Sequence, residues 1–256
     1  STRKESSAAS DVYKRQVSGA MTDLDYLYDF AIDHDLLVII DGAQAAGTVK
    51  IKFNERKYPR IIFCLTGHKA LFGPSGTGAI IDLSGEKFKN VFTGGSGVNS
   101  FDRFNPVDMP DVFEYGTINF HSIIALGAGV KFIDKVGIDK VSAKIHHLRK
   151  KLYYGIRDIP GIKLYSNEKD TSIVSFNYKD YASSEISEKL YKMSKIASRG
   201  GIHCAPLFHQ RVGTENQGIV RLSLSYFNNE DEIDKTIETI KTVSYTHLTL
   251  PTTPYV

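Results

Sequence analysis

The chain has 256 residues, enough for one large domain or two modest ones, and its 41% apolar and 24% charged residues are ordinary for a globular protein. A net charge of +3 is too small to indicate nucleic-acid binding, and no apolar run is long enough to span a bilayer. The two cysteines, Cys64 and Cys204, form no disulfide framework, so we expect a cytoplasmic protein.

The two ends of the chain differ from the rest. Residues 1–16 are small, polar and charged without helical or strand periodicity, and we expect a non-native or disordered leader. Residues 244–256 are rich in threonine and proline, and we expect a non-native tail. Neither segment enters the fold prediction.

Residues 17–140 are expected to belong to a large domain. Apolar residues at helical spacing predict an amphipathic helix over residues 22–34, with Thr22 as its cap. Strands are predicted over three ranges: 36–40, 61–65 and 77–82. Strand, helix and strand in alternation imply a mainly parallel sheet. A well-buried helix is predicted over 122–136.

A small domain is expected over residues 141–243, introduced by a long helix at 138–158 whose apolar positions share one face. The remaining elements are predicted as a strand of alternating character at 171–177, a helix at 184–194, a strand at 218–225 and a helix at 230–242. Two adjacent histidines on the long helix, His146 and His147, point in different directions, so we predict no metal site. His209 and Arg211 are expected at the surface.

The most informative stretch is 66–78, which directly follows a predicted buried strand and contains four glycines and a proline. Its one lysine, Lys69, stands beside His68. A lysine at this place suits pyridoxal 5′-phosphate, because the amine forms a Schiff base with the aldehyde and the ring acts as an electron sink. Taken alone, a surface lysine in a glycine-rich loop is an equally good interpretation.

A second stretch favours the cofactor. Asp41 ends a predicted strand, at the place where open α/β sheets bind ligands. A carboxylate there can pair with a protonated pyridine nitrogen, and Gln44 can donate to the phenolate oxygen of the ring. A helix-capping aspartate is the alternative. Asp41 and Lys69 at successive strand ends make the joint interpretation stronger than either residue alone.

These motifs resemble the class V aminotransferase superfamily, through Asp41-Gly42-Ala43-Gln44 followed by Thr66-Gly67-His68-Lys69. Within that superfamily, residues 198–206 and Val220-Arg221-Leu222-Ser223 resemble the cysteine desulfurase and selenocysteine lyase branch. The similarity runs over residues 17–243. It implies an α/β fold: a partial large domain of a fold-type-I pyridoxal-phosphate-dependent transferase, with a mainly parallel sheet, and a C-terminal α+β small domain.

The resemblance also implies roles for single residues. Thr66 and His68 would bind the cofactor phosphate from the lysine loop, and Thr117 would contact that phosphate across a homodimer. Arg221, together with Arg199, would bind the substrate, because a guanidinium suits the bidentate grip of an α-carboxylate. A solvated arginine on an edge strand is the alternative for Arg221.

Cys204 is the expected nucleophile, in a loop of glycines that ends in proline. A thiol needs electropositive neighbours to ionise, and Arg199 and His203 are close in sequence. A buried structural cysteine is the alternative, and it is the interpretation we favour for Cys64, which lies in an apolar strand.

The expected activity is conversion of L-cysteine to L-alanine with a persulfide left on the enzyme, and a sulfur-acceptor protein is an expected partner. The alternatives are a selenocysteine lyase and a class V aminotransferase or epimerase that makes no use of Cys204. A further alternative is a non-enzymatic sulfur carrier or scaffold that keeps the cysteine loop without the cofactor.

Two features of the resembling family have no counterpart in this sequence: the upstream hydroxyl residues that hold most of the phosphate, and the histidine that stacks on the pyridine ring. We therefore expect a fragment that lacks the N-terminal part of the large domain and is inactive by itself. Its sheet would then expose surface that missing strands would cover.

Overall fold

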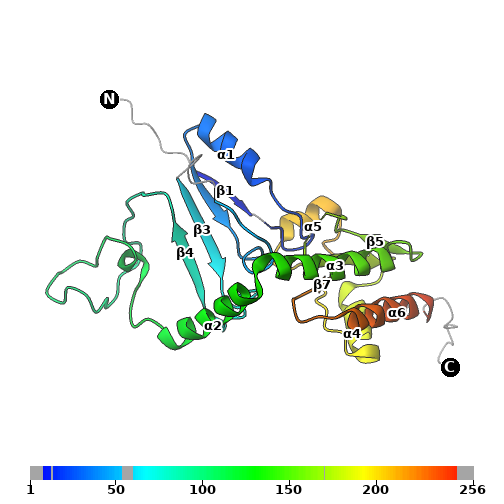
Figure 1. The fold of residues 1–256 in the computed structure, drawn as a ribbon. Helices are drawn as coiled ribbons and strands as arrows, with labels where there is room; N and C mark the ends of the chain where they lie inside the picture. The colour runs from blue at the N-terminus through cyan, green and yellow to red at the C-terminus, as the bar shows by residue number, and fades with distance from the viewer. Residues whose placement is uncertain (1–7, 13, 54–59, 170, 247–256) are drawn as a thin grey trace, which may run out of the picture. The chain divides into compact units, whose positions relative to one another are not determined.

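Two separate sheets organise the chain, which the structure, a computed structural model, describes at residues 8–12, 14–53, 60–169 and 171–246 (Figure 1). Each sheet belongs to its own compact unit. Unit 1 comprises residues 1–12, 23–46 and 51–135, and unit 2 comprises residues 13–22, 47–50 and 136–256. Residues 17–22, 47–50 and 136–140 therefore group with unit 2, although we predict them in the large domain.

The sheet of unit 1 has four strands in the order β1-β2-β3-β4. They are β1 (Ala8–Val12), β2 (Leu37–Asp41), β3 (Ile61–Thr66) and β4 (Gly78–Asp82). The pairs β1–β2 and β2–β3 are parallel and β3–β4 is antiparallel, which confirms a mainly parallel sheet. Strand β1 lies in the segment for which we predict no regular structure, so that expectation is wrong for residues 8–12.

Apolar side chains bury the two central strands, as their sequences predict. Val38, Ile40, Ile61 and Phe63 are almost fully buried. Strand β4 is different, because four of its five residues are exposed and it forms one edge of the sheet. The buried pair β2–β3 is therefore the firm part of unit 1.

The first helix, α1 (Leu24–Asp33), begins one residue later than the predicted cap implies. The side chain of Asp23, rather than Thr22, accepts hydrogen bonds from the backbone N–H groups of Asp25 and Tyr26, at 3.0 and 3.2 Å. An aspartate is a good N-cap and its charge suits the helix dipole. Tyr28 and Ala31 are the buried residues of this helix.

Helix α2 (Phe120–Val136) follows a short 3-10 helix, η1 (Asp111–Phe113). We predict α2 to be well buried, and this prediction is wrong. Among its residues only Gly129 and Ile133 are buried, whereas Ile124 and Phe120 are 70% and 55% exposed. The apolar sequence of α2 predicts that the helix is buried, but it does not show whether other described residues pack against it.

Unit 2 has a three-stranded antiparallel sheet in the order β5-β6-β7 and four helices among its described residues (Figure 1). The elements are α3 (Ile138–Arg157), β5 (Ile162–Leu164), β6 (Ile173–Tyr178), α4 (Ser183–Ser194), α5 (Pro206–Val212), β7 (Val220–Ser223) and α6 (Glu230–Thr246). Helix α3 confirms the predicted long helix. Nowhere in the described ranges is a helix both long and apolar enough to cross a membrane.

The apolar face of α3 forms the centre of the core of unit 2. Val141, Ile145, Leu148, Leu152 and Ile156 are all at most 3% exposed. They pack in one cluster with apolar residues of β6, α4, β7 and α6. Unit 2 therefore has a hydrophobic core of its own.

Three features of unit 2 differ from the sequence prediction. All six residues of β6 are buried, so the expected alternation is absent because both faces of this central strand are covered. Helix α5 occupies part of the segment predicted as loop. Helix α6 continues to Thr246, and the hydroxyl of Tyr178 donates to the carbonyl of Ser244 at 2.7 Å, so residues 244–246 are helical. The rest of the predicted tail lies outside the described residues.

We expect Leu148→Ala to lower the free energy of unfolding by about 2–5 kcal/mol, because it removes a buried side chain and leaves a cavity in this core. Urea denaturation followed by circular dichroism measures the change. Lys140→Ala, at an exposed position of the same helix, is the control and should change stability by no more than about 0.5 kcal/mol. A loss below about 1 kcal/mol for Leu148→Ala would contradict this assignment of the core.

Candidate active site

The residues predicted for the cofactor all lie in unit 1, whereas those predicted for substrate and sulfur chemistry lie in unit 2. In unit 1, the parallel pairing of β2 with β3 places Asp41 opposite Cys64. The N–H of Gly42 continues the ladder by donating to the carbonyl of Cys64 at 2.8 Å. Parallel strands end at the same edge, so the segments after β2 and β3 leave the sheet side by side.

Asp41 is exposed at the end of β2. Its carboxylate accepts a hydrogen bond from the N–H of Ala43 at 2.9 Å. Gly42 must be glycine, because a Cβ there would come within 1.8 Å of the Phe63 ring. Gln44 follows in a turn and is half-buried. A carboxylate and an amide therefore stand together just beyond β2.

The loop that carries Lys69 is held by its own hydrogen bonds. The N–H of Gly67 donates to the backbone carbonyl of Thr77 at 2.8 Å, and the carbonyl of Gly67 accepts from the N–H of Gly73 at 2.8 Å. The Thr66 hydroxyl lies 3.1 Å from Nδ1 of His68. A Cβ on Gly67 would come within 2.2 Å of the Thr77 hydroxyl oxygen. The loop is thus closely packed where Lys69, itself half-buried, leaves the strand.

This donor set fits pyridoxal phosphate in its chemistry. A carboxylate, a lysine, a hydroxyl and an imidazole follow two adjacent strand ends, and the glycines let Phe63 and Thr77 pack closely against these segments. Thr117 is exposed in the segment between η1 and α2.

Cys64 is half-buried rather than buried. Burial, and next the negative charge of Asp41, raise the pKa of its thiol, so at neutral pH the thiol stays protonated.

In unit 2, Cys204 sits on a tight turn. The N–H of Ala205 donates to the carbonyl of Ile202 at 3.0 Å, and His203 and Cys204 occupy the two central positions with φ angles of 55° and 57°. Such left-handed pairs suit glycine and asparagine, and other residues there cost about 1–3 kcal/mol each. The turn therefore needs support from its surroundings. Cys204 itself is exposed.

The segment before this turn is hydrogen-bonded to the edge of β7. Arg199 and Arg221 exchange both of their backbone hydrogen bonds, at 3.1 and 2.8 Å, and the N–H of Ile219 donates to Gly201 at 3.0 Å. Gly200 passes close to Ser183, since a Cβ there would lie 2.5 Å from the Ser183 carbonyl oxygen. The chain on the N-terminal side of Cys204 is therefore fixed to the sheet.

Arg221 is half-buried, and its Nη1 donates to the carbonyl of Gln16 at 3.1 Å. Burial and then the charge of Arg199 lower the pKa of Arg221, while the electrostatic interaction with Cys204 opposes this shift; the guanidinium stays charged. Within the described residues its Nε is buried without a hydrogen-bond partner. This cation has donor capacity left for an anionic ligand.

His203 does not supply the positive charge that we predict for it. Its ring is 2% exposed, and its Nε2 lies 2.7 Å from the carbonyl of Ile219. Burial is the main cause that lowers its pKa to about 4, and the charges of Arg221 and Arg199 act in the same direction against the Ile219 hydrogen bond. At neutral pH His203 is uncharged, so it adds no positive charge next to Cys204.

His209, predicted at the surface, is fully buried on α5, and its Nδ1 lies 2.8 Å from the Thr214 hydroxyl. Arg211 is exposed, as predicted. Sequence analysis missed α5, although Pro206 in its first turn and Gly213 as its left-handed cap are recognisable helix boundaries. Recognising the helix would have placed His209 and Arg211 on different faces.

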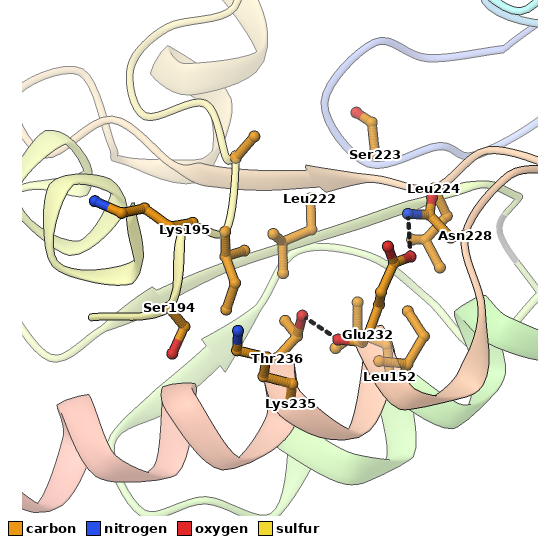
Figure 2. Close-up of a pocket in the computed structure, with 13 residues that line it drawn as sticks. Leu152, Ser194, Lys195, Leu222, Ser223, Leu224, Asn228, Glu232, Lys235 and Thr236 are labelled. Carbon is orange, nitrogen blue, oxygen red and sulfur yellow. Dashed lines mark hydrogen bonds between the residues drawn. The ribbon is translucent and has the colours of Figure 1, made fainter. Parts of the chain in front are cut away.

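A cavity of about 370 Å³ lies elsewhere in unit 2, between the end of α4, β7 and α6 (Figure 2). Part of its lining is apolar, including Leu152 and Leu222, and Glu232 accepts from the side chain of Asn228 at 2.9 Å. Leu222 and the next residue directly follow Arg221 in sequence. None of the residues predicted for cofactor, substrate or sulfur chemistry lines this cavity.

Nowhere in the described part of the chain do three or more His, Cys, Asp or Glu side chains form a group that could hold a metal ion. His146 is half-buried, and burial, followed by the charges of Lys150 and Arg149, lowers its pKa. His147 is exposed and lies 3.1 Å from Glu230. The two adjacent histidines thus have separate surroundings.

A family model and similar curated proteins assign this chain to the same family. Residues 10–236 match the model of the family described as "Aminotransferase class-V". A cysteine desulfurase of Wigglesworthia glossinidia brevipalpis is 33% identical over 219 residues, covering 81% of this chain and 50% of that protein. A probable cysteine desulfurase of Methanothermobacter thermautotrophicus is 28% identical over 232 residues, covering 88% of this chain and 58% of that protein. The chain thus spans little more than half the length of these relatives.

Solved structures share the fold. The apo structure of a cysteine desulfurase from Thermococcus onnurineus NA1 superposes with a TM-score of 0.80 at 23% identity, covering 93% of this chain and 60% of that one. The cysteine desulfurase CsdA from Escherichia coli superposes with a TM-score of 0.77 at 20% identity, covering 94% and 59%. These similarities confirm a fold-type-I α/β architecture for the region that the chain covers.

The lowered pKa of His203 makes stability depend on pH. An unperturbed histidine has a pKa of about 6.5, whereas that of folded His203 is about 4. Between these values the unfolded chain binds the extra proton, so the contribution of His203 is fully present above the unfolded pKa and is lost as pH falls through this window. We expect the free energy of unfolding, measured by urea denaturation, to fall more steeply over this range in the wild type than in His203→Gln. Equal slopes would contradict the assignment.

Proposed function

Because the chain belongs to the class V aminotransferase family, we propose that it serves pyridoxal-phosphate-dependent desulfuration of cysteine, which yields alanine and a persulfide on Cys204. One observation carries this choice within the family: an exposed thiol on a left-handed turn, beside a charged and half-buried arginine. An enzyme that only transfers amino groups has no use for such a thiol. The relatives named as cysteine desulfurases support the same choice.

The residues of unit 1 are assigned to the cofactor. Lys69 would hold pyridoxal phosphate through its amine, and Asp41 would keep the pyridine nitrogen protonated. Thr66 and His68 would bind phosphate oxygens, with Thr117 as a further phosphate ligand and Gln44 as the donor to the phenolate oxygen. When bound, the cofactor supplies an electron-withdrawing ring that lets the α-carbon of the substrate lose its proton.

Lys69 would move that proton, since a lysine amine acts as a base when its surroundings lower its pKa. Arg221, with Arg199, would orient the substrate through its α-carboxylate, because a guanidinium offers two parallel donors to a carboxylate. The unpartnered Nε of Arg221 supports this role.

Cys204 would act on sulfur. Its thiolate forms a bond to the sulfur of the substrate while the bond between that sulfur and the β-carbon breaks. The electron pair of the broken bond stays with the carbon part, which gains a proton and leaves as alanine. The sulfur remains on Cys204 as a persulfide, and a thiol of an acceptor protein can then attack it. Selenocysteine in place of cysteine would follow the same steps.

The proposal includes a homodimer and a reducing compartment such as the cytoplasm. Exposed apolar side chains of α2, including Phe120 and Ile124, support a partner surface on unit 1. Both cysteines are free thiols, which suits a reducing environment.

Labelling with the cofactor tests the assignment of Lys69. The chain is mixed with excess pyridoxal phosphate and reduced with borohydride, and peptides are analysed by mass spectrometry. We expect the pyridoxyl group on Lys69. The total yield of pyridoxyl label per chain should fall at least tenfold in Lys69→Ala but not in Lys87→Ala, an exposed position of the same unit. Labelling spread equally over exposed lysines would contradict the cofactor role and favour a sulfur-carrier module.

Thiol reactivity tests the assignment of Cys204. We expect iodoacetamide to modify Cys204 at least tenfold faster than Cys64 at pH 7, because Cys204 is exposed near Arg221 while Cys64 is half-buried with a raised pKa. Because this chain spans little more than half the length of its relatives and is expected to be inactive alone, alanine formation from cysteine is measured in a protein of their full length that carries this segment; it should disappear in Cys204→Ser and persist in Cys64→Ser. Desulfuration that survives Cys204→Ser, or amino transfer without desulfuration in the wild type, would instead support an aminotransferase.

A further inference from the structure

Two buried histidines of unit 2 lie next to Cys204 without taking part in the proposed chemistry. His203 and His209 are 2% and 0% exposed, and their ring centroids are 6.1 Å apart with planes inclined by 34°. Each ring has one nitrogen in a hydrogen bond and one that is buried without a partner among the described residues: Nδ1 of His203 and Nε2 of His209. Apolar side chains of similar size would fill the space without this cost, so packing alone does not account for the pair.

The backbone of Cys204 shows what the pair can do. His203 and Cys204 hold consecutive left-handed conformations that non-glycine residues adopt only when their surroundings require it. The turn has a single backbone hydrogen bond across it, from Ala205 to Ile202. Two further links hold the turn: the side chain of His203 reaches the carbonyl of Ile219, immediately before β7, and the side-chain amide of Gln16 donates to the backbone carbonyl of His203.

The ring of His209 lies behind that of His203. Nδ1 of His209 is held by the Thr214 hydroxyl, and Thr214 accepts, through its backbone carbonyl, from the N–H of Gly218, next to Ile219. Both histidines are therefore held to the same stretch before β7. Outward movement of the turn would break the hydrogen bonds of His203 with Ile219 and with Gln16 and would separate the two rings.

We propose that His203 is a positioning residue for Cys204: its buried ring, next to that of His209, holds the turn 202–205 to the interior so that the thiol stays at the exposed tip. This inference rests on the proposed function in so far as it takes Cys204 as the nucleophile. His203 itself touches neither the substrate nor the cofactor in this assignment.

The hydrogen-bonded ring of His203, which we call the anchor, is kept uncharged by burial and by the positive charges around it. The groups that face His203 are Arg221 on β7, Arg199 on the segment paired with it, and His209 on α5. A proton on His203 would add a positive charge beside two arginines in a buried place. The turn 202–205 should therefore stay bound to the interior at neutral pH and be released in acid.

Hydrogen–deuterium exchange of the full chain tests the anchor directly, through peptides that span residues 199–209. We expect His203→Ala to speed exchange in this segment at least tenfold, while peptides of α3 remain unchanged. His203→Gln should retain most of the protection, because its amide N–H can still donate to Ile219. Gln210→Ala, exposed next to His209, is the matched control and should leave exchange unchanged.

A pH series separates anchoring from a purely structural role. In the wild type, exchange of this segment relative to α3 should rise as pH falls toward 4, whereas in His203→Gln the ratio should stay constant. Unchanged exchange in His203→Ala, or the same pH series in both proteins, would overturn the proposal. If His203→Ala unfolds the whole unit, His203→Gln decides: protection like the wild type supports the anchor, and a tenfold loss overturns it.

The outcome is distinguishable from a failure of the proposed function. Exchange of residues 199–209 depends on the turn alone and needs neither cofactor nor substrate. If desulfuration proves not to depend on Cys204 while the exchange results are as expected, the function is wrong and the anchor stands. In the reverse case, the function stands and His203 is not the residue that positions the thiol.

Discussion

The parallel pairing of β2 with β3 is the constraint on which the candidate cofactor site depends. The ladder places Asp41 opposite Cys64, and the next hydrogen bond, from Gly42, carries the pairing past the end of the strand. A slip of one residue would turn the side chains of one strand to the other face, which would move the carboxylate relative to the lysine loop. The buried side chains of both strands favour this register, because a slip would move Val38 and Ile61 out of the positions in which they are fully buried. Chemistry at the strand ends thus depends on apolar packing at their centres.

Unit 2 solves a different problem, which is to keep a thiol accessible beside positive charge without adding a second buried charge next to Arg221. The guanidinium groups supply the charge, since arginine keeps its proton under almost all conditions. The histidine next to Cys204 in sequence is kept neutral by burial. A second cation at that position would raise the cost of burying Arg221. Arginine and histidine are both counted as basic, yet here Arg221 stays charged while His203 is neutral.

The spacing of apolar residues and the positions of glycine and proline were sufficient to predict the main helices and strands. The apolar face of α3 and the two runs that became β2 and β3 are patterns that only one structure satisfies, and the structure has them where predicted. Burial was harder, because it depends on what other segments cover. Helix α2 is apolar yet largely exposed, and β6 is covered on both faces where one was expected. Single polar residues were hardest: the burial of His209 follows only once Pro206 and Gly213 are recognised as the ends of a short helix, because the residue type alone does not distinguish a buried histidine from a surface one.

The exchange of backbone hydrogen bonds between Arg199 and Arg221 has a second effect, on association between molecules. Strand β7 is at the margin of its sheet, where free N–H and C=O groups can recruit strands from other chains. The segment that leads to Cys204 occupies part of that margin, at Arg199 and Gly201. It therefore protects this edge against pairing with strands of other chains. A movement of the Cys204 turn that keeps this protection has to bend beyond Gly201, because a larger movement would uncover the edge.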